Sequence, residues 1–524
     1  MSDFTTPSGV ASAHVDDFSR RMLPPVDQWP EMDWQSLPEL AAYPDRMNCA
    51  HDLLDKQAAV HGERPVIYFE DAVWSYNDLL DKANRIAHVL VDELGVKPGH
   101  RVLLRAPNNP MYVAAWFAVM KVGAVGVATM PLLRAKELVY IAERADVTVG
   151  FCDDHLKDEM EITLGRSKTL KRIVYFSNLG DKPDDDNLDA LITAKPATFD
   201  NVDTAADDVC LIAFTSGTTG PAKGCMHFHR DILAICDTFG RYVLKPTQDD
   251  IFCGSPPIAF TFGLGALVTF AMHVGAATAL CEAPAPETLL GLIQKHKATI
   301  CFTAPTAFRA MVDKISYYDT GSLQQCVSAG ETLPLPTFQA WQKATGIKII
   351  DGIGSTEMLH IFIAAAGDDI VPGATGKPIP GYAAKVIDDD GNDMAPGEVG
   401  RLAVRGPTGC RYLDNPERQA AYVQNGWNVT GDTYMMDDGG NFWFQARNDD
   451  MIISAGYNIS GPEVEATLMD HALVSECAVV AAPDPARGFI VKAFVLLRDP
   501  ANASVELVKE LQDFVKAEIA PYKY

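Results

Sequence analysis

The chain has 524 residues, of which 48% are hydrophobic and 22% charged, and this length predicts at least two domains of an ordinary globular protein. The formal net charge of -25 argues against nucleic-acid binding, because a phosphate backbone attracts lysine and arginine. The 11 cysteines include no CxxC pair, so we expect reduced, buried thiols and a cytoplasmic location rather than a disulfide or zinc framework.

Strands and helices alternate along the first two thirds of the chain. Ser75 is predicted to cap a helix whose apolar face carries Leu79, Ala83 and Ile86. Further helices are expected at 111–121, 136–144, 286–297 and 306–314, and strands at 101–105, 124–128, 147–151, 298–302 and 325–328. This alternation predicts an α/β fold of mostly parallel sheets covered by helices.

The segment 252–281 contains no Asp, Glu, Lys or Arg, but prolines and glycines interrupt it. A lipid-spanning helix needs about 20 apolar residues in sequence, so we predict a buried helix and strand and no membrane partner. The polar residues 1–21 contain no signal peptide. Strands at 384–387 and 400–404 predict a small antiparallel β-subdomain, and an α+β segment begins near 450.

The strongest motif follows an apolar strand at 211–214 and reads Thr-Ser-Gly-Thr-Thr-Gly-Pro-Ala-Lys-Gly over 215–224. Glycines let backbone N–H groups approach anionic oxygens, hydroxyls add donors, and Lys223 adds a charge. The motif therefore predicts a phosphate-binding loop rather than a linker. It is not a Walker A loop, because the Gly-Lys-Ser/Thr ending is missing.

This loop closely resembles the signature of the acyl/aryl-CoA synthetase, peptide-synthetase adenylation domain and luciferase superfamily. Three further segments, 351–357 (Asp-Gly-Ile-Gly-Ser-Thr-Glu), 427–432 and 447–452, resemble the adenine, ribose and hinge motifs of that family in the same order. The resemblance covers nearly the whole chain. It implies an enzyme that activates a carboxylic acid with ATP and Mg²⁺ as an acyl-adenylate and transfers the acyl group to coenzyme A.

The resemblance also implies the site residues. Phosphate contacts fall to Thr215, Ser216, Gly217, Thr218, Thr219 and Gly220, adenine-side contacts to Gly330, Glu331, Asp351, Gly352, Ile353, Gly354, Ser355 and Thr356, and ribose contacts to Asp432 and Arg447. Glu357 and Thr356 would hold the metal, and the implied catalytic residues are Lys223, Glu357, His229 and Gly456. Without such a function, Glu357 would be a surface carboxylate and Asp432 a member of an exposed salt bridge.

The implied organisation is an N-terminal domain over 1–447 and a small mobile lid over 448–524, with Asp449 as the hinge. Gly456 would lie against the pantetheine tunnel. The resemblance implies an adenylation lysine beyond a segment like Pro521–Tyr524, so we expect the lid to be truncated at Tyr524. Adenylate formation by a chain that ends there is expected to be impaired.

The segments 258–265 and 358–362 look most like those of benzoate and 2-aminobenzoate CoA ligases. That match assigns the acid pocket to Thr261, Phe262, Phe270, Ala329, Gly354, His360 and Ile361. Aromatic walls beside small residues favour a flat ring over a long chain. Core packing is the alternative for the two phenylalanines and for His360, and His227 and His229 are expected to pack in a loop rather than bind a metal.

Two other enzymatic functions remain open, which are loading of an acid onto a carrier protein and medium-chain acyl-CoA synthesis. A non-catalytic nucleotide-binding protein is a further class, but it would be expected to lack Lys223 or Glu357. The expected partners are an aromatic acid, ATP and coenzyme A, in a monomer or homodimer.

Overall fold

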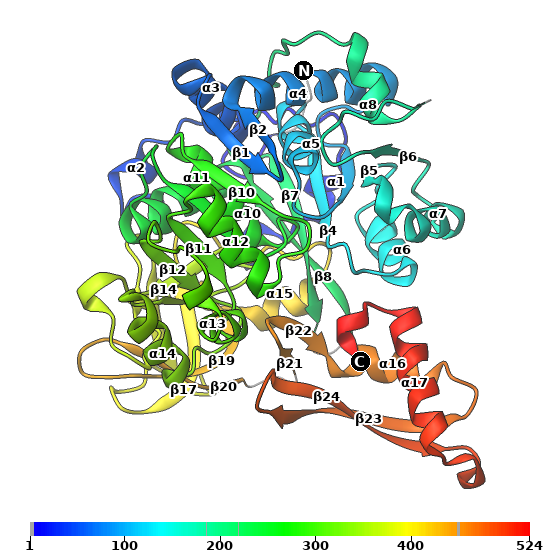
Figure 1. Ribbon diagram of the computed structural model, residues 1–524, viewed down its shortest axis with the longest axis vertical. Coiled ribbons are helices and arrows are strands. Elements are labelled where there is room, and N and C mark those ends of the chain that lie inside the picture. The colour runs from blue at the N-terminus through cyan, green and yellow to red at the C-terminus, as the bar shows by residue number, and fades with distance from the viewer. Residues whose placement is uncertain (1–4, 185, 218–219, 448–450) are drawn as a thin grey trace.

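The structure is a computed structural model that describes residues 5–184, 186–217, 220–447 and 451–524. In this part of the chain, two largely parallel sheets lie side by side at the centre of the molecule (Figure 1). The first has the strand order β6-β5-β3-β4-β7-β8, and only its last pair is antiparallel. Its strands are β3 (Arg101–Arg105), β4 (Val125–Thr129), β5 (Val149–Asp153), β6 (Arg172–Phe176), β7 (Val209–Gly217) and β8 (Gly220–Phe228).

The second sheet has the order β15-β14-β13-β12-β11-β9-β10-β1-β2, with parallel pairing from β13 to β1. Its strands are β1 (Pro65–Phe69), β2 (Ala72–Ser75), β9 (Ile251–Gly254), β10 (Ala277–Leu280), β11 (Ile300–Thr303), β12 (Gln325–Ser328), β13 (Ile350–Gly354), β14 (Ile361–Ala364) and β15 (Lys377–Pro378). The predicted α/β class is confirmed.

Helices lie at all the predicted places, namely α4 (Tyr76–His88), α5 (Pro110–Lys121), α6 (Ala135–Arg144), α12 (Pro286–His296) and α13 (Pro305–Val312). The helices α9 (His229–Ile235) and α14 (Leu335–Thr345) were not predicted. Ser75 caps α4 as expected, since its side chain accepts from the Asp78 N–H and the Asp78 carboxylate accepts from the Ser75 N–H. Helix α5 is buried on every side, so its apolar sequence reflects a position between other helices and a sheet.

The uncharged segment 252–281 folds as β9, α10 (Thr261–Leu264), a π-helical turn Gly265–Thr269, α11 (Phe270–His273) and β10. Nearly all of its apolar side chains are buried in the core. Among the described residues, no helix has the length and apolar character needed to cross a membrane.

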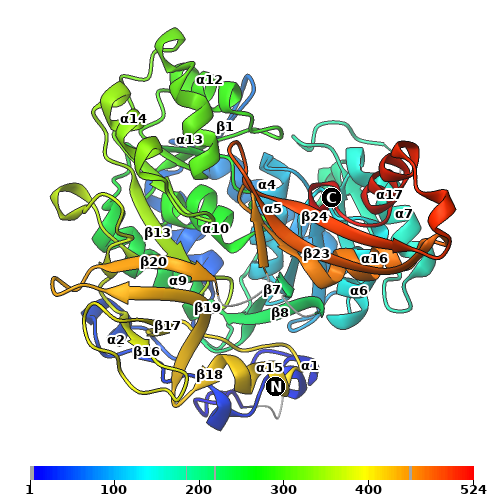
Figure 2. The same ribbon diagram turned by 90° about the horizontal axis from the view of Figure 1, so that it is seen from below.

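Two smaller sheets follow (Figure 2). The antiparallel subdomain contains β16 (Ala383–Ile387), β17 (Val399–Arg405), β18 (Val423–Gln424), β19 (Trp427–Met436) and β20 (Phe442–Arg447). The C-terminal part, which we call the lid, contains β21 (Met451–Ser454), β22 (Tyr457–Ser460), α16 (Gly461–Met469), β23 (Val474–Asp484), β24 (Gly488–Leu497) and α17 (Val505–Glu518). The lid has its own apolar core, which includes Ile452, Val464 and Leu511.

A buried ion pair anchors the strand that leaves the phosphate motif. Arg411 donates to the carboxylate of Asp231, and both side chains are fully buried. Asp231 also accepts from the Phe228 N–H at the start of α9 (2.9 Å), and Arg411 donates to the Met226 carbonyl (3.2 Å). Because a buried charge needs a partner, the pair ties β8 and α9 to the segment that carries Tyr412.

We expect Asp231→Asn to lower the free energy of unfolding by about 3–5 kcal/mol, because it leaves the Arg411 charge buried without its partner. The double variant Asp231→Asn/Arg411→Met removes both charges and should be less destabilised than the single variant. Urea unfolding followed by tryptophan fluorescence measures both. A double variant whose loss equals the sum of the two single losses would contradict this account.

Candidate active site

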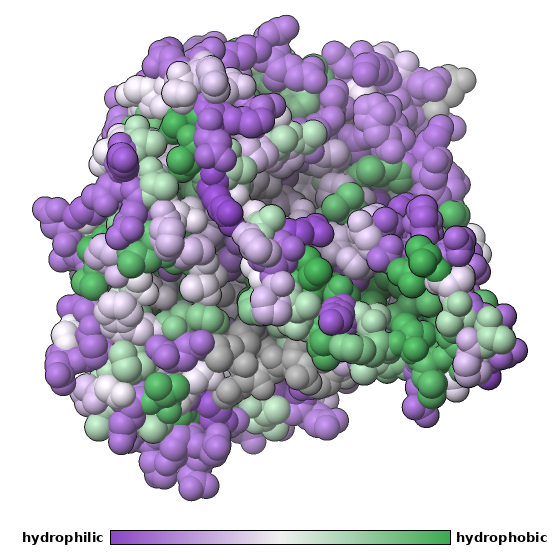
Figure 3. Space-filling model, turned by 60° about the horizontal axis from the view of Figure 1, so that its bottom comes forward, coloured by the Kyte–Doolittle hydropathy of each residue, from purple (hydrophilic) through white to green (hydrophobic). Residues whose placement is uncertain are grey.

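A cavity of about 630 Å³ lies where strands of both parallel sheets end. Residues just beyond the carboxyl ends of β4, β7, β9, β11, β12 and β13 line it, as do residues of α6 and of the lid. Ligands of open α/β sheets bind at this edge, because the loops there diverge and leave a crevice. The face of the molecule that carries the lid is hollowed near its centre (Figure 3).

The predicted phosphate loop is largely a β-hairpin. Strand β7 continues through Thr215 to Gly217, and β8 returns with Thr215 opposite Lys223. Thr215 and Ala222 line the cavity. Thr218 and Thr219 lie outside the described residues. A run of glycines and hydroxyls reads as a loop, but here each strand of the hairpin supplies the other's hydrogen-bond partner.

Tyr412 connects Lys223 to Glu357. The Lys223 ammonium lies 5.4 Å from the centre of the Tyr412 ring, and the Tyr412 hydroxyl donates to Glu357 Oε1 at 2.5 Å. Burial, together with the Glu357 carboxylate, raises the pKa of Tyr412 well above its ordinary value, so the hydroxyl keeps its proton. The two residues expected to act on the phosphates therefore belong to one cluster.

Glu357 follows the turn after β13, and the preceding residues Gly354, Ser355 and Thr356 line the cavity. The Thr356 carbonyl contacts His227 Nε2 at 2.8 Å, and Ser355 Oγ accepts from the Met358 N–H at 3.2 Å. Carboxylate and hydroxyl oxygens are the donors that Mg²⁺ prefers, so Glu357 and Thr356 fit the predicted metal.

The first three residues of the adenine-side motif do not line this cavity. Strand alternation directs Ile353 into the apolar cluster around Phe362. Asp351 lines a much smaller cavity, and burial raises its pKa to about 7. Gly352 is buried where an added Cβ would lie 2.8 Å from the Ile361 side chain. We expected all three at the nucleotide, and the structure brings only Gly354, Ser355 and Thr356 there.

The predicted ribose residues come from two neighbouring strands. Asp432 on β19 stands opposite Arg447 on β20 in the antiparallel register. The predicted hinge residue Asp449 lies outside the described residues. Asp432 does not line the cavity.

The predicted acid residues surround one imidazole. His360 lies 5.5 Å from the Phe262 ring and 4.6 Å from the Phe270 ring, measured between ring centres. Burial lowers the pKa of His360 to about 3, so the ring is neutral. In the described part of the chain, neither ring nitrogen has a hydrogen-bond partner of good geometry.

Six of the seven predicted acid residues line the cavity, namely Thr261, Phe262, Ala329, Gly354, His360 and Ile361. Phe270 is 1% exposed and lies behind His360, so it supports the wall rather than forming it. An added Cβ on Gly265 would lie 2.4 Å from His360 Cδ2. Leu359 has a φ of 69°, an uncommon backbone setting for a branched residue that directs His360 inward.

Gly456 reaches the cavity from the lid. Its φ is +84°, and an added Cβ would contact Ala304 at 3.4 Å and Glu331 Oε1 at 3.6 Å. Gly330 lies beside it, close to its backbone. Glu331 accepts from Thr306 Oγ1 at 2.6 Å and lines a second cavity of about 1160 Å³ between the lid and the helices α13 and α14. Gly456 therefore stands between the two cavities.

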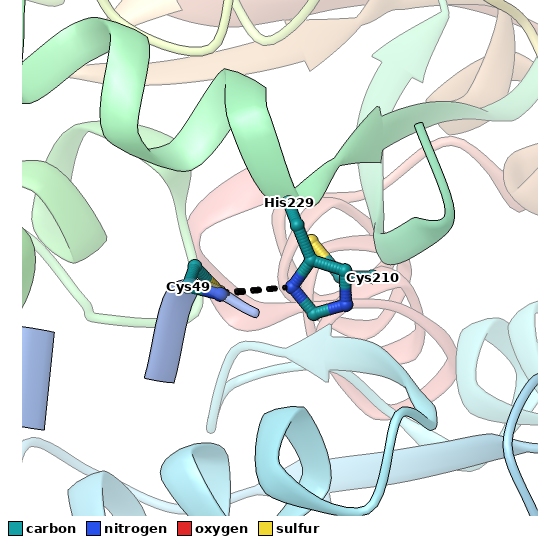
Figure 4. A group of neighbouring side chains, drawn as sticks. All are labelled: Cys49, Cys210 and His229. Carbon is teal, nitrogen blue, oxygen red and sulfur yellow. Dashed lines mark hydrogen bonds between the residues drawn. The ribbon is translucent and has the colours of Figure 1, made fainter. Parts of the chain in front are cut away.

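His229 is not at the cavity, although we expected it among the catalytic residues. Its fully buried ring contacts Cys49, whose N–H donates to Nδ1 at 3.2 Å, and Cys210 lies on its other side (Figure 4). His229 is the first residue of α9 and follows directly after β8. The buried position of His229 favours a packing role. Only its position after the phosphate motif had suggested catalysis.

Sequence reasoning missed several residues that the fold brings to Glu357 or to the rim of the cavity. Tyr412 stands in a segment without a motif, and only the fold brings it to Glu357. Glu137, Glu463, Tyr522 and Lys523 also line the cavity. These residues come from three distant segments, so neither spacing nor periodicity could have grouped them.

Comparisons with known proteins agree with this geometry. The family model described as AMP-binding enzyme matches residues 54–411, and that of the AMP-binding enzyme C-terminal domain matches residues 463–524. The chain is 32% identical over 498 residues to a benzoate–CoA ligase of Thauera aromatica, covering 94% of each protein. It is 31% identical to the human mitochondrial acyl-coenzyme A synthetase ACSM3, covering 92% of this chain and 86% of that one.

Among solved structures, an anthranilate CoA ligase in complex with anthranoyl-AMP matches with a TM-score of 0.75 and 33% identity, covering 92% of this chain and 93% of that chain. The chain is thus an acid–thiol ligase that uses ATP, Mg²⁺ and coenzyme A. It belongs to the AMP-binding enzyme family.

Proposed function

We propose that the protein is an aryl-acid CoA ligase that activates benzoate or 2-aminobenzoate. The observation that carries the proposal is the closed end of the acid cavity. There His360 and Phe262 form a wall, and Phe270, Phe239 and Phe302 lie behind it, with ring centres no more than 6.3 Å from those of their neighbours. A flat ring fits against such a wall, whereas a long acyl chain would need an opening through it.

The first half-reaction would place the acid carboxylate against the α-phosphorus of ATP. The carboxylate oxygen forms a bond to that phosphorus, and the bond to the β-phosphate breaks as pyrophosphate leaves. The hairpin β7–β8 orients the phosphates, and Lys223 adds positive charge beside them. Tyr412 fixes the direction of the Glu357 carboxylate, which with Thr356 would hold Mg²⁺.

In the second half-reaction, the sulfur of coenzyme A attacks the acyl carbon and AMP leaves. We propose that the thiol arrives through the cavity of about 1160 Å³ and passes Gly456. Glycine there keeps the passage open between Ala304 and Glu331. We further propose that the lid, residues 448–524, moves about Asp449 between the two half-reactions.

We also propose a cytoplasmic location. It is supported by the cysteines, since all 11 are free thiols in the described chain and 9 of them are buried, which suits a reducing compartment.

The choice of acid can be tested with the full-length protein and a panel of acids. ATP–pyrophosphate exchange and acyl-CoA formation should be fastest with benzoate or 2-aminobenzoate, and slower by at least about tenfold with octanoate, whose chain the aromatic wall would block. Preference for octanoate would overturn the aryl proposal and favour a medium-chain acyl-CoA synthetase, while acid activation itself would stand.

Recognition of an ortho substituent is expected to involve Thr261 or His360. We expect Thr261→Ala to lower kcat/KM for 2-aminobenzoate relative to benzoate by about tenfold, the cost of one lost hydrogen bond in a buried site. Thr261→Ser keeps the hydroxyl and is the matched control. Identical ratios of the two acids in the wild type and in Thr261→Ala would remove Thr261 from this role.

Gly456→Ala should slow acyl transfer to coenzyme A at least about tenfold, because the added methyl narrows the passage and the positive φ disfavours alanine. Gly440→Ala is the control, since Gly440 has a φ of +78° and nothing within 4 Å of an added Cβ. Acyl-CoA formation from pre-formed benzoyl-adenylate measures this step alone. Equal slowing by both variants would mean that backbone strain, not the passage, is responsible.

A further inference from the structure

Three charged side chains from three segments meet at the edge of the acid cavity. Lys523, in the last turn Pro521–Lys523, donates to Glu137 on α6 and to Glu463 on α16, the latter at 2.8 Å. The Lys523 side chain is 5% exposed, that of Glu137 is 9% exposed and that of Glu463 is 24% exposed. An ammonium group between two carboxylates is thus largely withdrawn from water.

The second carboxylate oxygen of Glu137 accepts hydrogen bonds from both sides of the interface between α6 and the lid. This oxygen, Oε2, accepts from the Arg134 N–H at 2.8 Å, which caps α6, and from the Ala520 N–H of the lid at 3.0 Å. One carboxylate therefore joins the start of a helix in the N-terminal part to both the backbone and the ammonium group of the lid's last turn. Charge-assisted bonds of this kind are the stronger hydrogen bonds of proteins.

The cluster is part of the cavity wall. Glu137, Glu463 and Lys523 all line the cavity, and so does Tyr522, whose ring stacks on that of Tyr457 with 4.3 Å between centres. Tyr457 follows Gly456 directly in the chain. The contacts that hold the last turn on α6 therefore also support the strand next to Gly456.

The electrostatics favour a charged latch. Burial opposes the charge of Lys523, but Tyr522, Glu137 and Glu463 together keep its pKa above the ordinary value. If the ammonium were lost, two partly buried carboxylates would face each other without compensation. Removing one partner of an ion pair that is withdrawn from water lowers stability far more than removing one partner of an exposed pair.

We propose that Glu137 is a positioning residue that, with Lys523 and Glu463, latches the lid in the arrangement that presents Gly456 to the cavity. The latch joins the lid to α6, so any rotation of the lid that withdraws Gly456 must break it. It would therefore promote acyl transfer to coenzyme A and give no help to adenylate formation. This inference rests on the two-step reaction proposed above.

Two variants test the latch. Glu137→Gln keeps an acceptor for the Ala520 N–H but removes the charge, and Lys523→Met removes the ammonium group while keeping the chain length. Each should form benzoyl-CoA from pre-formed benzoyl-adenylate at least about tenfold more slowly in single turnovers. The double variant should lose no more than the slower single variant, because the two residues act through one contact.

ATP–pyrophosphate exchange by the same full-length variants should remain at the wild-type rate or rise. A general loss of structure would slow both half-reactions, so this split separates positioning from damage. Asp470→Asn is the matched control. This variant breaks the Lys136–Asp470 ion pair (3.0 Å), which also joins α6 to the lid but whose side chains are 45% and 65% exposed. Because exposed pairs contribute little, Asp470→Asn should change the rate of acyl transfer by less than about twofold.

Hydrogen–deuterium exchange of residues 519–524 gives a readout that needs no substrate, because the Ala520 N–H should lose protection in both latch variants. Transfer and protection equal to the wild type in both variants would overturn the latch and leave the proposed function intact. A wild type that cannot use benzoyl-adenylate would instead refute the aryl substrate. In that case, the protection of the Ala520 N–H in the two variants would by itself show whether the latch exists.

Discussion

The site depends on one hydrogen bond, from the Tyr412 hydroxyl to the Glu357 carboxylate. Tyr412 is held by the segment that the buried Arg411–Asp231 pair ties to β8, and Lys223 on β8 lies over its ring. The Lys223 ammonium group from the hairpin and the Glu357 carboxylate after β13 thus contact the same tyrosine side chain. Tyr412 thereby links strand β8 of the first sheet to the turn after β13 of the second, and we propose that the two charges act on the phosphates and the metal.

The arrangement of the two sheets creates the cavity beside these charges. Parallel strands end together, and here the ends of β4 and β7 from one sheet face those of β9, β11, β12 and β13 from the other. The acid wall grows from the loops after β9 and β13, and the lid covers the opening. Residues of both sheets and of the lid therefore meet around one cavity because of strand polarity.

Most of the fold could be predicted from the sequence, because its helices and strands are periodic and well capped. Helix α6 and strand β4 lie within one residue of the predicted bounds, and Ser75 caps α4 as expected. Six of the seven residues assigned to the acid pocket line one cavity, and their role there stays a prediction. His229 does not line that cavity, because a motif fixes a residue's position in the chain and not the side of the sheet that it faces.

Contacts between distant segments could not be predicted. Tyr412 and Lys523 have no local pattern, since their partners lie 55 and 386 residues away. Asp351 belongs to a recognisable motif but lines a different, smaller cavity, because strand side chains alternate. Contacts between charges far apart in the sequence, and the face of the sheet to which a strand residue points, decide which residues reach the cavity. Neither can be deduced from the spacing of residues in the sequence.

The missing Cβ at residue 265 has a consequence for tracing this protein's history. The imidazole of His360 occupies the volume that any larger residue at 265 would fill, so the two positions form one steric unit. Ancestors in which the depth of the acid cavity changed are expected to have exchanged residues 265 and 360 together. The intermediates would have carried small residues at both positions. Covariation of positions 265 and 360 would then record shifts in substrate size more faithfully than either residue alone.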